Sequence, residues 1–482
     1  MEIKFILKKS LRSNPAQMQI VNYLLLFKII FLFSCSDKIS NNPLKDYVNK
    51  VDESFRYEVI DTVRGNNWSE IKIKMVSGNW MDSDLVENNE WWHMLNVIIP
   101  DDLIHNESMM IISSGSTDNY DDKISVPKHI IDAAISTKSI ISIINNIPFQ
   151  PTVFSKDNNK KRYEDDLIAY GWRKFLERGS KKEDEEWLAR FPMTRAVSRA
   201  MDVVQEVGNN NIVVDSFFVT GASKRGWTAW TSAIADDRVM GIAPVVIDML
   251  NVYPSFKHHW RVYGDWSPAI NDYIHHGIMD YMGSNEYKRL TEIVEPYSYR
   301  DILKLPKYIV NASSDEFFVT DSWKFYWDNL IGKKHIRYVP NAGHGLYGRY
   351  VTNDIISYYS NLINNYNLPE YSWDVSDSLI SVKIFGNEKY SIKKWMATNE
   401  KDRDFRKPVI GESWISSDIE INESGSYTFN LETPQNGFSA IFYEIVFNEE
   451  TEFPISITTG TKVLPEIYPF DDFVSKNPLG TR

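Results

Sequence analysis

The stretch FFVTGASKRGW, residues 217–227, joins an apolar run to a glycine and then to a serine two positions later. This pattern predicts a β-strand that ends in a tight turn and continues as a helix. In G-x-S-x-G, the turn that presents a nucleophilic serine, Gly221 would be the first glycine, but Arg225 stands at the second and Gly226 comes one later. Ser223 is therefore either a nucleophile or a helix cap.

Apolar runs and helical patterns alternate on both sides of this stretch. The alternation predicts a mainly parallel sheet with helices on both faces, preceded by antiparallel strands between residues 57 and 100. The strands of the parallel part are expected at 108–113, 139–144, 216–220, 239–247, 308–312 and 335–339, and the clearest helices at 164–176 and 193–207. The fold class is α/β.

Two further polar residues follow predicted strands as Ser223 does. Asp315 comes after the strand at 308–312, and His344 after the strand at 335–339. Ligands bind beyond the carboxyl ends of the strands in such sheets, and the order Ser, Asp, His is that of α/β-hydrolases. A serine hydroxyl needs an imidazole to take its proton and an acid to orient that imidazole. The ensemble favours catalysis over capping for Ser223.

An oxyanion site is predicted beside this serine. The backbone N–H of Lys224 lies at the helix start, where the helix dipole favours negative charge. A second donor is expected from the loop at 113–119, where Gly115 allows close backbone approach and Ser116 follows it.

The segment between the strands near 247 and 308 is expected to form a cap over the site, at about 252–290. We expect Trp260, Tyr263 or Trp266 to wall a pocket above Ser223. The candidate substrate-binding residues are Arg225, His258, Arg261 and Trp266. If Lys224 or Arg225 points into the pocket, an anionic substrate is favoured; if both pair with carboxylates outside it, that idea falls.

Neither a metal nor a cofactor is expected. The neighbouring histidines His258/His259 and His275/His276 do not share a helix face, as two ligands of one metal ion on a helix would. The net charge of −12 and the lack of a dense Lys/Arg block in the mature region exclude a nucleic-acid surface. A small molecule, a peptide or a sugar ester is the expected partner.

The N-terminal segment has the pattern of an export signal. Charged residues precede the apolar IVNYLLLFKIIFLF, which ends in LFSC at Cys35. LFSC resembles a bacterial lipobox, so residues 1–35 are predicted to be a lipoprotein-type signal peptide, with a lipid anchor on Cys35 at a membrane face. An ordinary cleaved signal and a secreted product are the alternative, and Met18 is an alternative start to Met1.

The remaining boundaries follow from composition. Residues 36–52 are predicted to be a polar linker, 53–365 the hydrolase domain, and 366–482 a small β-sandwich, because helical periodicity fades after Pro369. We expect no long helix between residues 378 and 461. Within this module, KKWMATNEKDRDFR at 393–406 is expected at an interface or in a loop, with Trp395 buried.

Longer stretches resemble a known family, the PhoPQ-activated pathogenicity-related proteins, to which the autocrine proliferation repressor proteins are also similar. The matching stretches are GASKRGWTAW, PVVIDMLN, EPYSYRD, PKYIVNASSDEFFVTDSWKFYWDNL, VPNAGHGLYG and KKWMATNEKDRDFR. The resemblance covers about residues 55–470. It implies an exported α/β-hydrolase domain followed by a β-rich module, with Ser223, Asp315 and His344 at the family's triad positions. It implies no substrate. The serine turn also resembles that of acetyl-xylan and glucuronoyl esterases.

The sequence therefore predicts an exported serine hydrolase that acts on an ester or an amide, with an esterase favoured. An activity like that of aminopeptidases or dipeptidyl peptidases is one alternative. A non-catalytic signalling or binding protein on a hydrolase scaffold is the other.

Overall fold

The structure is a computed structural model that describes residues 42–119, 125–208, 212–366 and 368–482. The predicted signal segment, with Met18 and Cys35, lies outside the described residues. The chain divides into units Met1–Pro43 and Leu44–Arg482, and the second is described below.

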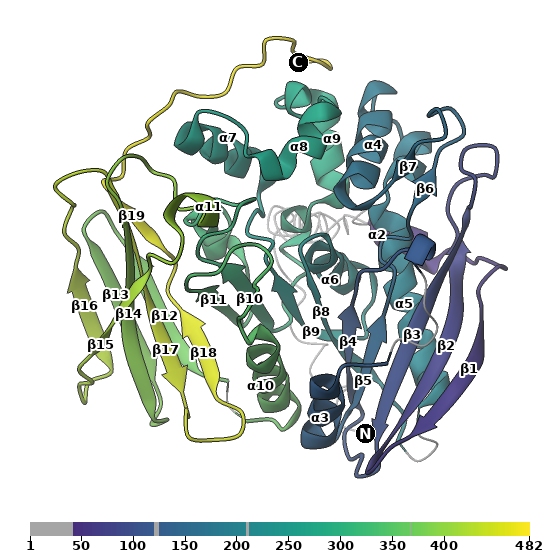
Figure 1. Ribbon diagram of the computed structural model, residues 1–482, viewed down its shortest axis with the longest axis horizontal. Coiled ribbons are helices and arrows are strands. Elements are labelled where there is room, and N and C mark those ends of the chain that lie inside the picture. The colour runs from purple at the N-terminus through teal and green to yellow at the C-terminus, as the bar shows by residue number, and fades with distance from the viewer. Residues whose placement is uncertain (1–41, 120–124, 209–211, 367) are drawn as a thin grey trace, which may run out of the picture. The chain divides into compact units, whose positions relative to one another are not determined.

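A mixed sheet forms the centre of this unit (Figure 1). In the described residues its nine strands follow the spatial order β1-β2-β3-β5-β4-β8-β9-β10-β11. The pairs β1–β2, β2–β3 and β3–β5 are antiparallel. All the pairs from β5–β4 to β10–β11 are parallel. The strands are β1 (Arg56–Arg64), β2 (Trp68–Asn79), β3 (Glu90–Pro100), β4 (Glu107–Ile112), β5 (Ile140–Ile144), β8 (Ser216–Ala222), β9 (Val239–Val245), β10 (Lys307–Ala312) and β11 (Lys334–Val339).

Helices cover both faces of the sheet because its central strands are apolar on both sides. Phe217 and Val219 of β8 pack in one core with α5 and α6, and Phe218 packs in a second core with α3 and α10. Continuous apolar runs are typical of parallel strands buried on both faces. The helices of this part are α3 (Lys128–Thr137), α4 (Glu164–Glu177), α5 (Arg190–Val207), α6 (Lys224–Ala235) and α10 (Val351–Ile363), with a small hairpin of β6 (Thr152–Val153) and β7 (Lys161–Arg162).

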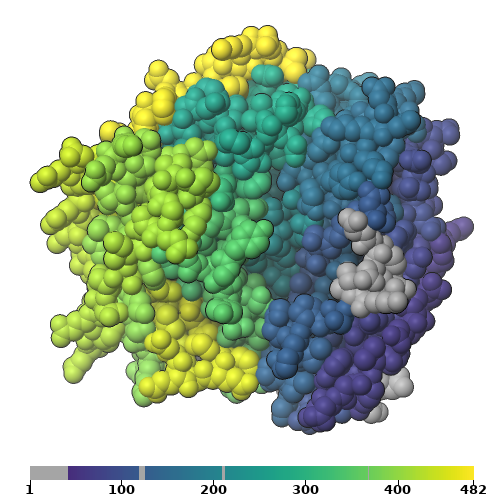
Figure 2. Space-filling model, viewed as in Figure 1, coloured from purple at the N-terminus to yellow at the C-terminus, as the bar shows by residue number. Residues whose placement is uncertain are grey.

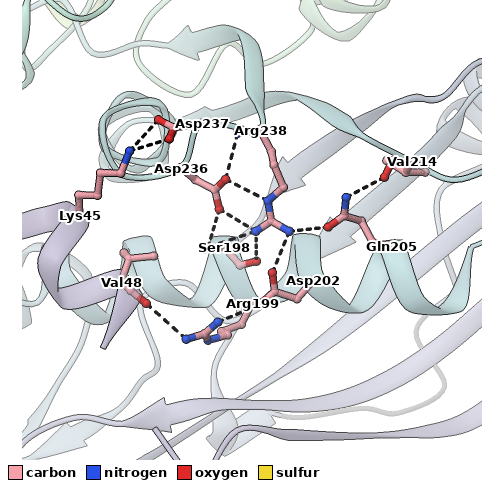
Figure 3. Close-up of polar contacts among 10 residues, drawn as sticks. All are labelled: Lys45, Val48, Ser198, Arg199, Asp202, Gln205, Val214, Asp236, Asp237 and Arg238. Atoms are coloured by element: carbon pink, nitrogen blue, oxygen red, sulfur yellow. Dashed lines mark hydrogen bonds and ion pairs between the residues drawn. The ribbon is translucent and has the colours of Figure 1, made fainter. Parts of the chain in front are cut away.

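Polar contacts fix α5 against the turn between α6 and β9 (Figure 3). Arg238 donates to Asp236, to Gln205 of α5 and to the Ser198 carbonyl. Arg199 of α5 donates to the carbonyl of Val48. Val48 belongs to a helix, α2 (Pro43–Asn49), so this part of the segment predicted as a polar linker, 36–52, is helical. Leu44 and Val48 make α2 amphipathic, which is why it packs instead of remaining solvated.

The cap is the insertion between β9 and β10. It comprises α7 (Val252–Tyr263), α8 (Asn271–His275) and α9 (Asn285–Val294), with short 3-10 turns at Pro268–Ile270, Met279–Tyr281 and Pro296–Tyr299. It therefore extends a little beyond the predicted end at 290. Helix α4 packs against α8 and α9, so the cap rests on the hydrolase body.

The C-terminal module is a β-sandwich, as predicted. One sheet has the order β12-β13-β16, and the other β15-β14-β17-β18 with β19 beside β17. Its strands are β12 (Glu370–Val375), β13 (Leu379–Phe385), β14 (Tyr390–Asn399), β15 (Ile415–Ile419), β16 (Ser426–Asn430), β17 (Phe438–Phe447), β18 (Ile455–Thr458) and β19 (Lys462–Leu464). Between 378 and 461 the helix is the single turn α11 (Lys407–Ile410). Trp395 is half-buried, not buried as predicted, and its indole N–H donates to the Glu444 carboxylate at 2.7 Å.

Residues 465–482 leave the sandwich, which corrects its predicted extent. This C-terminal strap lies across the cap, as the yellow atoms over the teal ones show (Figure 2). The ring of Phe473 packs on Trp260 and Trp266 of the cap. Near the end, the N–H of Thr481 donates to Glu286 of α9 at 2.8 Å. The strap therefore holds Trp260 and Trp266, two aromatic residues that the sequence assigned to the pocket, and the third, Tyr263, lies under the guanidinium of Arg406.

Within the described residues no helix is both long and apolar enough to cross a bilayer. In the same part of the chain, no three His, Cys, Asp or Glu side chains are grouped as metal ligands would be.

Candidate active site

Ser223 occupies a strained turn between β8 and α6. Its backbone has φ 58° and ψ −125°, a conformation that side-chain-bearing residues rarely adopt. Its N–H donates to the Val245 carbonyl of the neighbouring strand at 2.8 Å. Such strain costs on the order of 1–3 kcal/mol and is concentrated at functional sites. The turn presents the serine hydroxyl at the carboxyl edge of the sheet.

Two glycines allow this turn to close. A Cβ on Gly226 would lie 2.9 Å from the Gly221 carbonyl oxygen and 3.0 Å from that of Val245. A Cβ on Gly221 would lie 2.8 Å from the Arg225 carbonyl oxygen. Gly226 thus makes the close helix–strand contact, and the side chain of Arg225 is free to point away from it. The departure from G-x-S-x-G moves the second glycine by one residue.

We expect Gly226→Ala to destabilise the protein. Alanine raises helix propensity by about 1 kcal/mol over glycine, so propensity alone predicts a gain. The two carbonyl oxygens near the new methyl group belong to backbone and cannot move aside. A lower midpoint in thermal unfolding would verify the close contact. An unchanged or higher midpoint would contradict it.

The structure brings Ser223, Asp315 and His344 together. Ser223 Oγ lies 2.9 Å from His344 Nε2, and Nδ1 of the same ring lies 3.0 Å from both carboxylate oxygens of Asp315. Asp315 follows β10 and His344 follows β11, which are neighbours in the sheet. One Asp315 oxygen also accepts from the Phe317 N–H at 2.7 Å. The acid is therefore held, and it orients the imidazole toward the serine.

Burial and charge oppose each other at His344. Burial lowers the pKa of the imidazole, and the adjacent Asp315 carboxylate raises it by more, so the net pKa lies above its ordinary 6.5. The ring of Phe317 lies against the imidazole, with centroids 4.1 Å apart. The arrangement stabilises an imidazolium, the state that forms when a histidine accepts a serine proton.

The predicted oxyanion donors lie beside the turn. Strand β4 pairs with β8, and Ile112 lies opposite Gly221, so the loop that follows β4 begins next to the turn. In that loop, Gly115 approaches the backbone of Asn146 so closely that a Cβ would lie 2.9 Å from its nitrogen. Ser116 uses its hydroxyl locally, accepting from Asp118 N–H at 3.2 Å. Lys224 is the first residue of α6, where N–H groups lack intrahelical acceptors.

Both cations of the turn are already paired. Lys224 Nζ lies 2.9 Å from Glu164 and 3.0 Å from Asp165. The guanidinium of Arg225 pairs with Glu164 and donates to the Ile147 carbonyl at 2.7 Å. Arg225 is not among the residues that line the pocket at Ser223. Lys224 and Asp165 do line that pocket, so the predicted condition, pairing outside it, is met by Arg225 and not by Lys224. Because carboxylates already neutralise both cations, neither is free to bind an anionic group of a substrate.

Ser223 lines a small cavity of about 30 Å³, enough for one or two water molecules. The cap contributes Phe256, Ile270 and Tyr273. The rest of the lining combines aromatic side chains with charged ones: Trp172, Trp227, Phe317 and Phe318, and Asp165, Arg190 and Lys224. A pocket beneath the cap was predicted, but its walls differ: Trp260, Tyr263 and Trp266 do not line it. Its size favours a short acyl group.

A larger groove of about 580 Å³ lies between α3 and α10, with Gly221 and Gly345 at its border. It is lined mainly by apolar side chains of the sheet and of these helices. Neither Ser223 nor His344 lines it, so we place the reacting group in the smaller cavity.

The other predicted substrate residues lie elsewhere. His258 is buried, 2.8 Å from Asp321, and contacts the hydroxyl of Tyr468 in the strap. Arg261 pairs with Asp472 of the strap and lies over the Tyr468 ring. Trp266 packs on Phe473. Each was misassigned because the strap, a little over two hundred residues away in sequence, covers the face of the cap that they occupy.

Sequence reasoning missed three polar residues of the pocket, Arg190, Trp172 and Asp165. Arg190 was left out because helix α5 begins at Arg190, three residues before the predicted start at 193. The sequence did carry a sign of this. Arg190 directly precedes the apolar residues 191–193, at the start of a helix expected to pack on the sheet, and an arginine in such a buried place is unusual.

The strand order, the strained serine turn and the cap inserted after β9 define the class of the fold: it is an α/β-hydrolase. The model of the PhoPQ-activated pathogenicity-related protein family matches residues 44–406, and the chain belongs to this family. It is 34% identical to autocrine proliferation repressor protein A of Dictyostelium discoideum over 483 residues, 94% of this chain and 96% of that protein. The sequence-based recognition of the family is confirmed.

Solved structures with similar folds include two esterases. Acetyl xylan esterase from Paenibacillus sp. R4 aligns with a TM-score of 0.46 and 13% identity, covering 67% of this chain and 92% of that one. A glucuronoyl esterase from Solibacter usitatus aligns with a TM-score of 0.38 and 11% identity, covering 64% and 86% of the two chains.

Proposed function

We propose that this protein is a serine hydrolase that cleaves an ester by acyl transfer. The observation that carries the proposal is Ser223, held at φ 58° with its hydroxyl 2.9 Å from an imidazole that a buried carboxylate orients. Backbone strain of this kind is typical of a nucleophilic serine, because the strained turn presents the hydroxyl to the base.

The residues have the following roles in this proposal. Ser223 Oγ attacks the substrate carbonyl while His344 Nε2 takes its proton, and Asp315 stabilises the imidazolium. The N–H groups of Lys224 and of the loop at Gly115 stabilise the oxyanion. His344 then protonates the departing alcohol. A water molecule, deprotonated by the same histidine, cleaves the acyl-serine and restores the enzyme.

One observation favours an ester over an aminopeptidase-type substrate. Recognition of a free N-terminal amine needs an uncommitted carboxylate near the serine. Of the described residues that line the cavity, Asp165 carries the carboxylate, and it already pairs with Lys224 and accepts from Tyr273. A peptidase would have to break this pairing, which costs free energy in a buried site.

A fluorophosphonate probe, followed by peptide mapping, tests the proposal. We expect covalent modification of Ser223, and hydrolysis of short acyl esters in preference to aminoacyl arylamides. A protein that resists the probe at every serine would instead fit a binding or signalling role on a hydrolase scaffold. The name of the Dictyostelium relative, a proliferation repressor, makes that second function worth testing.

We also propose that the protein is exported and that Cys35 carries a lipid anchor; both rest on the pattern of residues 1–35. Fractionation of cells that express the full chain tests this. Cys35→Ser should move the protein from the membrane fraction to the soluble exported fraction. Retention in the cytoplasm would contradict export.

The activity is expected to rise with pH through an apparent pKa above 6.5, because His344 must be neutral to accept the serine proton and its pKa is raised. Asp315→Asn should move that midpoint to lower pH and reduce kcat by about 10⁴-fold. The stability linked to His344 has the opposite dependence: it is fully present below the unfolded pKa of about 6.5 and is lost as pH rises through the folded pKa. Profiles of kcat/KM against pH measure the midpoint of the activity, and a wild-type midpoint at or below 6.5 would contradict a raised pKa of His344.

A further inference from the structure

The cavity at Ser223 contains a buried arginine with no carboxylate partner. Arg190 is 2% exposed and lines the cavity together with Ser223. Among the described residues, no carboxylate lies within ion-pair distance of its guanidinium. Its Nη1 donates to the Lys224 carbonyl at 2.6 Å, and its Nε has no hydrogen-bond partner. Burial lowers the pKa of Arg190 to about 10, so the group stays charged at neutral pH.

The charges around the serine leave this cation in excess. Glu164 and Asp165 are the carboxylates that neutralise Lys224 and Arg225. Asp315 is held by His344, and Asp165 lies near enough to raise the pKa of Arg190 without forming an ion pair with it. Of the three cations Lys224, Arg225 and Arg190, the last is the one without an ion pair among the described residues. A buried charge without a partner is costly unless a ligand supplies the counter-charge.

A second unpaired donor lines the same cavity. The indole N–H of Trp172 is buried and has no hydrogen-bond partner, and Trp172 comes from α4 whereas Arg190 comes from α5. Buried donors normally find acceptors, so two orphaned donors at one cavity indicate an acceptor that arrives with the substrate.

A purely structural role does not account for Arg190. The Lys224 carbonyl that it bonds also accepts from the Thr228 hydroxyl at 3.0 Å, so that oxygen is satisfied without the arginine. The guanidinium also lies over the Trp227 ring, 4.9 Å from its centroid, a cation–π contact that stabilises its charge in part but leaves Nε without an acceptor.

We propose that Arg190 and Trp172 bind a carboxylate on the acyl part of the substrate, so that the preferred substrate is an ester of a short dicarboxylic acid. This inference rests on the proposed function and names its substrate class. The small cavity excludes a long acyl chain, and the charged fork of an arginine matches a carboxylate.

Kinetics with two matched substrates test the inference. The wild type should hydrolyse mono-p-nitrophenyl succinate with a higher kcat/KM than p-nitrophenyl butyrate. Arg190→Met should lower kcat/KM for the succinate ester by about 10- to 100-fold, mainly through KM, and the loss on butyrate should be at least about tenfold smaller. Trp172→Phe, which removes only the indole N–H donor, should raise KM for succinate several-fold. Arg190→Lys should retain part of the preference.

Two variants serve as matched controls. Arg195 lies on the same helix, is equally buried and stacks on Tyr47, but it pairs with Asp52 away from the cavity. Trp230 is a buried tryptophan whose indole N–H also lacks a partner, and it does not line the cavity. Arg195→Met and Trp230→Phe should leave the succinate-to-butyrate ratio of the wild type unchanged.

An equilibrium measurement separates this inference from the proposed function. Sodium malonate should raise the thermal midpoint of the wild type and of Trp230→Phe, and it should not raise that of Arg190→Met. This readout needs no turnover. If malonate raises the thermal midpoint but the fluorophosphonate does not label Ser223, the proposed hydrolase function is overturned and the anion site is retained. Labelling with no malonate shift, or equal losses on both esters in Arg190→Met, would overturn the anion site alone.

Discussion

Ser223→Ala is expected to abolish fluorophosphonate labelling and to lower kcat for ester hydrolysis by about 10⁴-fold or more. The hydroxyl is the group that His344 reaches at 2.9 Å, and an alanine at the same turn leaves the rest of the site in place. Residual hydrolysis would come from the oxyanion donors and from binding alone. Steady-state kinetics on a short acyl ester measure the change.

The same turn provides an internal comparison. Ser223→Gly should be as inactive as Ser223→Ala but more stable, by about 1 kcal/mol, because glycine adopts φ 58° without the penalty that a Cβ brings. Ser232 of α6, which donates within its own helix, is the control, and Ser232→Ala should keep the wild-type kcat. If Ser223→Ala retained more than about a tenth of the activity, the nucleophile would have to be another residue.

Removal of Arg403 is expected to lower the free energy of unfolding by about 3–5 kcal/mol, the cost of breaking a buried ion pair from one side. Arg403 lies in the loop after β14 of the sandwich, and its Nη2 is 2.7 Å from Asp321 of the hydrolase domain. Both side chains are buried. Asp321 also pairs with His258 and Lys324, each at 2.8 Å. The stretch 393–406, predicted to lie at an interface or in a loop, thus supplies from its loop the charge that pairs with the hydrolase domain.

The pH dependence of this effect has a definite sign. Burial alone would raise the pKa of Asp321, and Arg403, followed by Lys324 and His258, lowers it well below its ordinary value. A depressed folded pKa contributes stability above the unfolded value of about 3.9, and this stability is lost as pH falls through the folded pKa. The difference between wild type and Arg403→Met should therefore be largest near neutral pH and smaller in acid.

Urea unfolding of both proteins at neutral and acid pH measures that difference. Arg56, which pairs with Glu90 on the exposed side of β1, is the matched control, and Arg56→Met should leave the unfolding midpoint nearly unchanged. Equal midpoints for Arg403→Met and the wild type at neutral pH would show that the buried pair does not stabilise the fold.

The sequence by itself determined the architecture and the three residues at the edge of the sheet. Apolar runs at regular intervals show where strands end, and parallel strands end at one edge. A serine, an acid and a histidine that follow such runs therefore meet in space, as Ser223, Asp315 and His344 do. Family membership could likewise be inferred from ordered stretches of residues, since these do not depend on knowing any contact.

Only the tertiary structure decided which other side chains face the serine. Arg225 turns away because Gly226 makes the close contact, and Arg190 enters the cavity because α5 begins earlier than its periodicity indicates. His258 and Arg261 are taken by the C-terminal strap. Local patterns report the exposure of a residue on its own element. The partner of a side chain depends instead on packing between elements far apart in the chain, and that packing leaves no periodic signal in the sequence.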